Sequence, residues 1–246
     1  MKIKFVTLTG ADDKTDASKM AELSQKFPFV EWAILFSQTK SGNPRYPSDQ
    51  WIEASLPKLA SCFLSAHLCG KWVSDAMDGV FTFQKMSSAF GRIQLNMAGS
   101  RLRHVLADKT KFWEACEAAG FGPRESLCMD CEKPQLILGG PYLSNSIPVE
   151  KFNFFKAAPL FDCSGGRGII SDNWLEFPAE IPLCGYAGGL GPDNIEEQLK
   201  KLEEVVGDNT IWIDMESKIR SNDEFDLEKC EKVLSIVAEY KWNQLL

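Results

Sequence analysis

Short apolar runs recur along the chain, and segments with apolar residues at helical spacing lie between them. This order is typical of βα units, in which a strand enters a parallel sheet and a helix returns the chain to the same edge. The pattern therefore predicts eight strands. We place them at Lys2–Thr9, Val30–Phe36, Cys62–Leu68, Arg92–Met97, Gln135–Leu138, Pro159–Asp162, Pro182–Tyr186 and Thr210–Asp214.

Eight strands in 246 residues leave roughly 31 residues for each repeat, about the size of one βα step. This length and strand count favour an α/β fold, the closed (β/α)8 or TIM barrel. The alternative is an open doubly wound sheet, which places a GxGxxG turn after an early strand. The turn after the first predicted strand reads LTGADDKTD and lacks that fingerprint. No stretch has linker composition, so residues 1–246 are expected to form one domain.

Polar residues mark two helix starts near the end of the chain. Asp193-Asn194 precedes a segment with apolar residues at helical spacing, and Asp226 opens the final helix in the same way. Gly120–Glu132 carries glycine and proline breaks without a clear period, and it is interpreted as a long connection before the fifth strand.

Composition narrows the partners and the compartment. The chain has 27 basic and 34 acidic residues, and a net charge of -7 argues against a nucleic-acid partner. Eight cysteines in a chain of this length, without a signal-peptide pattern at its start, indicate reduced thiols and a cytoplasmic protein. The longest apolar runs fall far short of the ~20 residues of a membrane span, so no membrane is expected. We expect a monomer or a homodimer without a cofactor or a metal.

In such a barrel the chemistry lies in the loops after the strands, at the carboxyl-terminal end called here the mouth. Two glycine stretches follow the sixth and seventh predicted strands. Glycine lets backbone N–H groups approach a ligand oxygen closely, and loops this late in the barrel are the usual phosphate site. The alternative is that these glycines only turn the chain from strand to helix. The glycine-stretch residues taken as phosphate-binding are Gly165, Gly166, Arg167, Gly168, Gly188 and Gly189.

Six sequence pieces, in one order along nearly the full chain, resemble the phosphoribosylanthranilate isomerase family. They are VTLTG at Val6–Gly10, PRYPS at Pro44–Ser48, RIQLN at Arg92–Asn96, LFDCSGGRG at Leu160–Gly168, YAGGLGPDNI at Tyr186–Ile195 and WIDMESKIR at Trp212–Arg220. The resemblance implies the same barrel and an Amadori rearrangement of a phosphoribosyl compound. That reaction needs an acid for the ribose ring oxygen and a base for a proton on the adjacent sugar carbon.

The resemblance also implies roles for individual residues. Asp162 matches the family's acid, whereas Thr9 occupies the position of the cysteine that serves as base. Arg45 matches the residue that faces the substrate's carboxylate. The resemblance also places Gln94 and Asn96 on the substrate side and Glu216 and Ser217 in the phosphate loop. The chain departs from the family at Asn96, at Arg167 and at Glu216-Ser217-Lys218, which stands where the family has SSG.

A threonine hydroxyl has no accessible anion near neutral pH, so Thr9 cannot simply replace the cysteine. Asp12 or Asp13 is one alternative base, although helix capping is the simpler interpretation of both. His67 and Cys69, near the end of the third predicted strand, are another. Three further residues are not assigned to the site. Cys128 and Cys131 form a CxxC that is interpreted as two ordinary thiols, and His104 is interpreted as a surface residue.

Two hypotheses follow for the function. The first is an isomerase or lyase-type enzyme that acts on a phosphorylated sugar or phosphoribosyl-type molecule, with Asp162 as general acid. The second is a catalytically silent barrel that binds a phosphate ligand or regulates another process.

Overall fold

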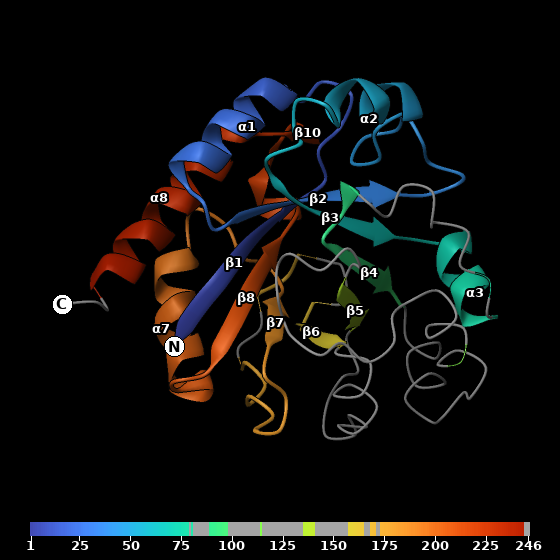
Figure 1. The fold of residues 1–246 in the computed structure, drawn as a ribbon. Helices are drawn as coiled ribbons and strands as arrows, with labels where there is room; N and C mark the ends of the chain where they lie inside the picture. The colour runs from blue at the N-terminus through green and yellow to red at the C-terminus, as the bar shows by residue number, and fades with distance from the viewer. Residues whose placement is uncertain are drawn as a thin grey trace.

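The computed structural model describes residues 1–78, 80, 89–97, 114, 135–140, 157–164, 168–170 and 173–243. Eight parallel strands pair in sequence order, and the first pairs with the last, so the sheet closes into a barrel (Figure 1). The architecture is therefore the (β/α)8 barrel. The strands are β1 Lys2–Thr9, β2 Val30–Phe36, β3 Phe63–Leu68, β4 Arg92–Asn96, β5 Gln135–Gly140, β6 Ala158–Asp162, β7 Cys184–Ala187 and β8 Thr210–Met215.

The eight predicted strands are confirmed, with ends that shift by no more than two residues. The predicted connection Gly120–Glu132 lies outside the described residues. The sequence interpretation missed a two-residue hairpin between β8 and the last helix, formed by β9 Arg220–Ser221 and β10 Glu224–Phe225. Asn222 and Asp223 turn this hairpin with φ values of 52° and 60°. These are the positive angles that tight hairpin turns require.

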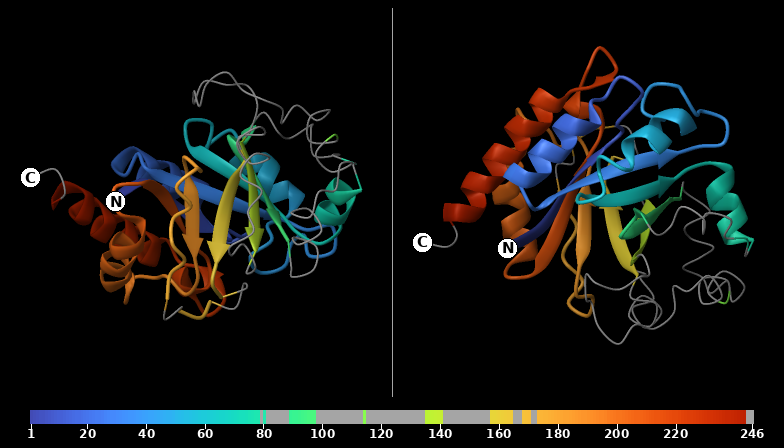
Figure 2. Two further views of the ribbon diagram at one scale, coloured as in Figure 1. Left: turned by 90° about the horizontal axis from the view of Figure 1, so that it is seen from below. Right: turned by 45° about the horizontal axis from the view of Figure 1, so that its top comes forward.

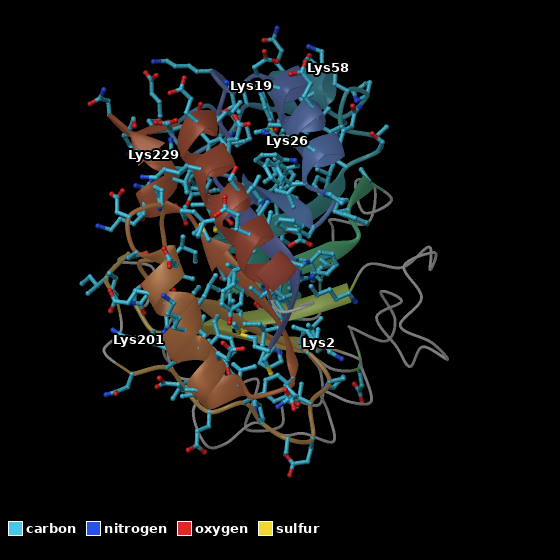
Figure 3. The ribbon with its side chains drawn as sticks, turned by 90° about the vertical axis from the view of Figure 1, so that its left-hand side faces the viewer. Lys2, Lys19, Lys26, Lys58, Lys201 and Lys229 are labelled. Atoms are coloured by element: carbon cyan, nitrogen blue, oxygen red, sulfur yellow. The ribbon has the colours of Figure 1, made fainter. Side chains whose placement is uncertain are left out.

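Helices cover the outside of the barrel (Figure 2), and α1 and α7 both contact α8. The described helices are α1 Ala17–Lys26, α2 Asp49–Ser55, α3 Lys71–Met77, α7 Ile195–Val206 and α8 Leu227–Asn243, with a 3-10 turn η3 at Ser217–Ile219. Figure 3 looks onto the solvent side of α1, α7 and α8, where labelled lysines include Lys26 and Lys201. These two pair with Glu231 and Glu197 on the surface. No helix in the described part of the chain is long and apolar enough to cross a bilayer.

The helix caps correct one prediction and refine another. Asp16 caps α1, with its Oδ1 accepting from the N–H of Ser18 at 2.8 Å, so capping by Asp12 or Asp13 was wrong. Asp226 accepts from two N–H groups in the first turn of α8, as predicted. The start of α7 is also confirmed, but Asn194 caps no N–H group of that helix.

Side chains alternate between the two faces of the sheet, as strand geometry requires. Residues facing the helices form the main core, which includes Leu8, Trp32 and Tyr186. Residues facing the barrel axis differ from one half of the barrel to the other. Apolar or small residues on β5 to β7 join Phe5 and Trp212 in a small second core. Apart from Ala33 and Leu35 on β2, most of the other inward positions carry buried polar residues: Thr7, Thr9, Glu31, Ser65, His67, Arg92, Gln94 and Asp214.

Candidate functional site at the barrel mouth

The strongest electrostatic feature of the mouth is Asp214, near the end of β8. Its side chain accepts a hydrogen bond from the Thr9 hydroxyl, with 2.7 Å between Thr9 Oγ1 and Asp214 Oδ1. Burial raises the pKa of Asp214 to about 8, and the negative charges of Glu216, Glu31 and Asp162 act in the same direction. The hydrogen bond from Thr9 opposes this shift. Asp214 therefore holds a proton at neutral pH.

Sequence reasoning placed Asp214 at the end of the eighth strand, at the mouth, but gave it no role in the site. The available signal was its place near the end of the eighth strand, on the same face as Trp212. Thr9, which was selected, lies beside it and serves as a hydrogen-bond donor. The Thr9 hydroxyl thus lies where the resemblance places the base, but the group with the shifted pKa is its partner, Asp214.

Asp162 ends β6 on the other side of β7. Its Oδ1 accepts from the backbone N–H of Ser164 at 3.0 Å and from the Ser164 hydroxyl at 2.8 Å. Asp162 and Asp214 both pair in register with Ala187, which lies on the strand between them. Two strand spacings separate their Cα atoms by about 10 Å. The two side chains are near enough for the charge of Asp162 to raise the pKa of Asp214.

A polar network covers the side of the mouth formed by β3 and β4. Gln94 Nε2 donates to Asn96 Oδ1 at 2.6 Å, and Asn96 Nδ2 donates to Cys69 Sγ at 3.2 Å. Burial raises the pKa of the Cys69 thiol, although hydrogen bonds with Asn96 and Tyr46 oppose the shift. Cys69 thus remains a thiol near neutral pH and is a poor base.

His67 on β3 lies on the same side of the barrel, and its side chain is buried, with 1% exposed. Burial, together with the positive charge of Arg92, lowers the pKa of His67 to about 3. The imidazole is therefore neutral over the physiological range. A neutral imidazole has one nitrogen that donates and one that accepts, which suits it to hydrogen bonding with a ligand.

Arg45 extends across the mouth from the loop after β2. Its Nη1 contacts Glu216 Oε1 at 2.8 Å and Ser217 Oγ at 3.5 Å, and its Nε lies 3.3 Å from Asp223 Oδ1. The guanidinium is thus held by two carboxylates of the β8 loop and hairpin. The resemblance implies that Arg45 faces a substrate carboxylate. Within the described residues, Arg45 instead pairs with the carboxylates of Glu216 and Asp223. Its side chain therefore joins the loop after β2 to the loop and hairpin after β8.

Asp12 ties the first loop to the last hairpin. Its Oδ2 accepts from Arg220 Nη2 at 2.7 Å and from the N–H of Phe225 at 3.2 Å, and its Oδ1 accepts from the N–H of Lys14. Arg220 also donates to the carbonyl of Gly10. A carboxylate so fully engaged holds two loops together. This arrangement does not present Asp12 as a base to a ligand.

The glycine loops after β6 and β7 meet the loop after β8. A Cβ on Gly168 would lie 2.9 Å from Ser217 Cβ, and one on Gly188 would lie 3.3 Å from the Ser164 nitrogen. The amide of Asn194 accepts from Gly191 N–H and donates to the Gly189 carbonyl, which fixes the turn. The structure thus brings together the described members of the predicted phosphate site. Gly165, Gly166 and Arg167 lie outside the described residues, as do His104, Cys128 and Cys131.

Backbone conformation makes Gly189 specific for glycine. Its φ is +64°, and an added Cβ would lie 2.5 Å from the backbone nitrogen of Ile170. Gly207 is a matched control, because its φ is +60° and an added Cβ would meet nothing within 4 Å. Both alanine variants carry a backbone strain of about 1–3 kcal/mol, because L residues rarely adopt a positive φ. Gly189→Ala should lose a further 1–3 kcal/mol, roughly the cost of overpacking, in urea unfolding. Equal losses for the two variants would show that the β7 loop is not packed as described.

Below the mouth, β2 and β4 contribute a buried ion pair that sequence reasoning missed. Arg92 Nη1 lies 3.1 Å and 3.2 Å from the two carboxylate oxygens of Glu31, and Thr7 donates to Glu31 at 2.8 Å. The Arg92 guanidinium stacks on Trp212, 4.1 Å from the ring centroid. A charged pair therefore occupies a barrel interior that branched apolar side chains usually fill. Among the described residues, no group of three or more His, Cys, Asp or Glu side chains is arranged to hold a metal ion.

No protein-family model matches the chain, and neither does any curated protein. Among solved structures, it is similar to a truncated 3-deoxy-D-arabino-heptulosonate 7-phosphate synthase from Thermotoga maritima. The identity is 12% and the TM-score is 0.51, over 97% of this chain and 86% of that chain. Such a likeness shows the barrel fold and nothing about the activity.

Phosphoribosyl anthranilate isomerase from Thermococcus kodakaraensis is more distant in shape, with 12% identity and a TM-score of 0.42 over 96% of this chain and 99% of that one. That score supports no further conclusion. The class that the fold and the comparison with the synthase define is therefore that of a TIM-barrel protein.

Proposed function

We propose that the protein is an acid–base enzyme, of isomerase or lyase type, that acts on a phosphorylated sugar or phosphoribosyl-type small molecule at the barrel mouth. The observation that carries the proposal is the pair Asp162 and Asp214. The two carboxyl groups come from strands on either side of β7 and face the same mouth, but they have different surroundings. Unequal surroundings of this kind separate the roles of acid and base in an active site.

The surroundings support one division of roles. Asp214 is buried and protonated at neutral pH, so it is the proton donor. Asp162 accepts two hydrogen bonds from Ser164, and we assign it the role of proton acceptor because it is the other carboxyl group at the mouth. The resemblance gives the acid role to Asp162, and the proposal reverses it. The proton goes to the sugar oxygen as its bond to carbon breaks, and a second proton leaves the adjacent carbon.

The three late loops support a phosphate site beside this pair. Loops after the seventh and eighth strands are the usual phosphate site of such barrels. Gly168 lies against Ser217, and Gly188 lies against Ser164. Within the described part of the chain, no residue accepts a hydrogen bond from the N–H of Gly188 or Gly189. We assign these unpaired groups to phosphate oxygens.

Thr9 supports the alternative of a silent ligand-binding barrel. Its hydroxyl is committed to Asp214 and is not a titratable base. In that case the phosphate would bind and no proton would be exchanged.

Deuterium exchange tests the two functions. We would incubate the protein in deuterium oxide with N-(5′-phosphoribosyl)anthranilate and a panel of aldose and ketose phosphates, and follow C–H signals by NMR. An acid–base enzyme should exchange or rearrange at least one substrate. Asp162→Asn and Asp214→Asn should each reduce that rate by about a hundredfold or more. Asp208→Asn, on the surface, is the control.

The expected result of Asp208→Asn is an unchanged rate. No exchange with any member of the panel, combined with binding of inorganic phosphate, would support the silent barrel. Full activity in both Asp162→Asn and Asp214→Asn would contradict the proposed pair.

A further inference from the structure

Unpartnered polar atoms are concentrated inside the barrel. Across the described residues, seven buried side-chain nitrogen or oxygen atoms have no hydrogen-bond partner. One of them, Arg220 Nε, lies near the hairpin. The other six belong to inward-facing residues: Ser65 Oγ, His67 Nε2, Arg92 Nε, Arg92 Nη2, Gln94 Oε1 and Trp212 Nε1. Because each buried unsatisfied group costs about 1–3 kcal/mol, such a concentration points to a missing hydrogen-bonding partner.

Two of these residues lie at the level of the mouth. His67 and Gln94 are register partners on the adjacent strands β3 and β4, and both side chains face the axis. Neighbouring parallel strands lie about 4.8 Å apart, so one small group can reach both side chains. Both residues are almost fully buried, 1% exposed for His67 and 3% for Gln94. Strand order places them across the barrel from the β6 to β8 loops.

The orientation of the Gln94 amide determines which ligand groups can hydrogen-bond to this side of the mouth. Its nitrogen donates to Asn96, so the unpartnered oxygen Oε1 needs a donor. The partner for His67 Nε2 must hydrogen-bond as well. A hydroxyl group donates and accepts, and therefore satisfies either atom. An aromatic ring in the same place would leave both atoms buried and unpaired, which a site built for hydroxyl groups rejects strongly.

We propose that His67 and Gln94 form a hydroxyl-binding subsite, and that the substrate is the phosphate ester of a polyhydroxylated carbon chain rather than of an aromatic amine. This inference rests on the proposed function, because it uses the phosphate site across the mouth to orient the chain. The hydroxyl groups of the sugar reach β3 and β4, and the reacting carbons lie between Asp162 and Asp214.

Calorimetric titration of the wild-type protein tests the subsite without any need for turnover. The sugar and polyol ligands are glycerol 3-phosphate, ribose 5-phosphate and fructose 6-phosphate. The ligands without hydroxyl groups on the carbon skeleton are propyl phosphate and phenyl phosphate. At least one sugar or polyol phosphate should bind about tenfold or more tightly than both propyl phosphate and phenyl phosphate, because its hydroxyl groups satisfy one or two further hydrogen bonds.

Variants localise the effect. Gln94→Leu and His67→Gln should weaken the best sugar phosphate by about tenfold and leave propyl phosphate unchanged. Ser65→Ala is the matched control, because Ser65 precedes His67 by two residues on the same inward face and lies one level deeper. Its expected affinity for every ligand equals that of the wild type.

The outcomes separate this inference from the proposed function. If propyl or phenyl phosphate binds the wild type as tightly as every hydroxylated ester, the subsite is wrong and the phosphate site stands. If no phosphate ester binds at all, the proposed function itself fails. Equal weakening of propyl phosphate and sugar phosphate in folded Gln94→Leu would also overturn the subsite.

Discussion

Replacing Arg92 with methionine is expected to lower the free energy of unfolding by about 3–5 kcal/mol, the usual cost of removing one partner from a buried ion pair. Arg92 is 4% exposed and Glu31 is 2% exposed, so the remaining carboxylate would stay in the interior without its counter-charge. The stacking of the guanidinium on Trp212 would also be lost. Urea unfolding followed by tryptophan fluorescence measures the change.

A second variant separates charge from packing. Glu31→Leu combined with Arg92→Met removes both charges and should recover most of the lost stability, since apolar replacements of buried pairs are often neutral or better. Thr7 keeps its acceptor Glu31 in Arg92→Met and loses it only in the double variant, so this cost reduces the stability that the double variant recovers. A double variant less stable than Arg92→Met would show that Glu31 contributes through its hydrogen bonds rather than through the pair.

The pH dependence of stability should change when Asp214 is replaced by asparagine. A carboxyl with a raised pKa stabilises the folded chain at low pH, and this contribution is lost as pH rises through the folded-state value. The ordinary value is 3.8 and the folded value is about 8. Between these limits the wild type should lose up to about 1.4 kcal/mol per pH unit from this one group.

The asparagine variant holds no such proton, so its stability should fall less steeply over the same range. Asp193→Asn serves as the control, because the Asp193 side chain is 93% exposed and takes part only in a surface ion pair with Lys232. Chemical unfolding at pH 4, 5, 6, 7 and 8 gives the three curves. Parallel curves for the wild type and Asp214→Asn would mean that Asp214 is already ionised in the folded protein.

Local patterns were enough to predict the strands and several inward residues. The apolar runs of β1 and β6 are readable in a few residues, and they place Thr9 and Asp162 at strand ends. The β9–β10 hairpin also had a signal, since Asn222-Asp223 is a pair that tolerates positive φ.

The properties of the site depended on contacts between distant residues. Arg92 and Glu31 are 61 positions apart and come from strands that are not neighbours, so their pairing requires the closed barrel. The pKa of Asp214 depends on burial and on charges from β2, β6 and the β8 loop. Arg45 could be assigned to a loop, but its partners Glu216 and Asp223 follow it by more than 170 residues. Sequence spacing carries no information about such neighbours.

The pairing of β1 with β8 has a consequence for how the chain reaches this fold. Lys2 pairs with Thr210, and the bond from Arg220 to Asp12 closes the same seam 208 residues apart. Closing so long a loop lowers the chain entropy before any contact between β1 and β8 can stabilise it, and a high contact order slows folding. On a ribosome, β1 has no partner on that side until almost the whole chain has emerged. A nascent chain halted before β8 is therefore an open sheet with two exposed edges, and exposed edges of this kind promote aggregation.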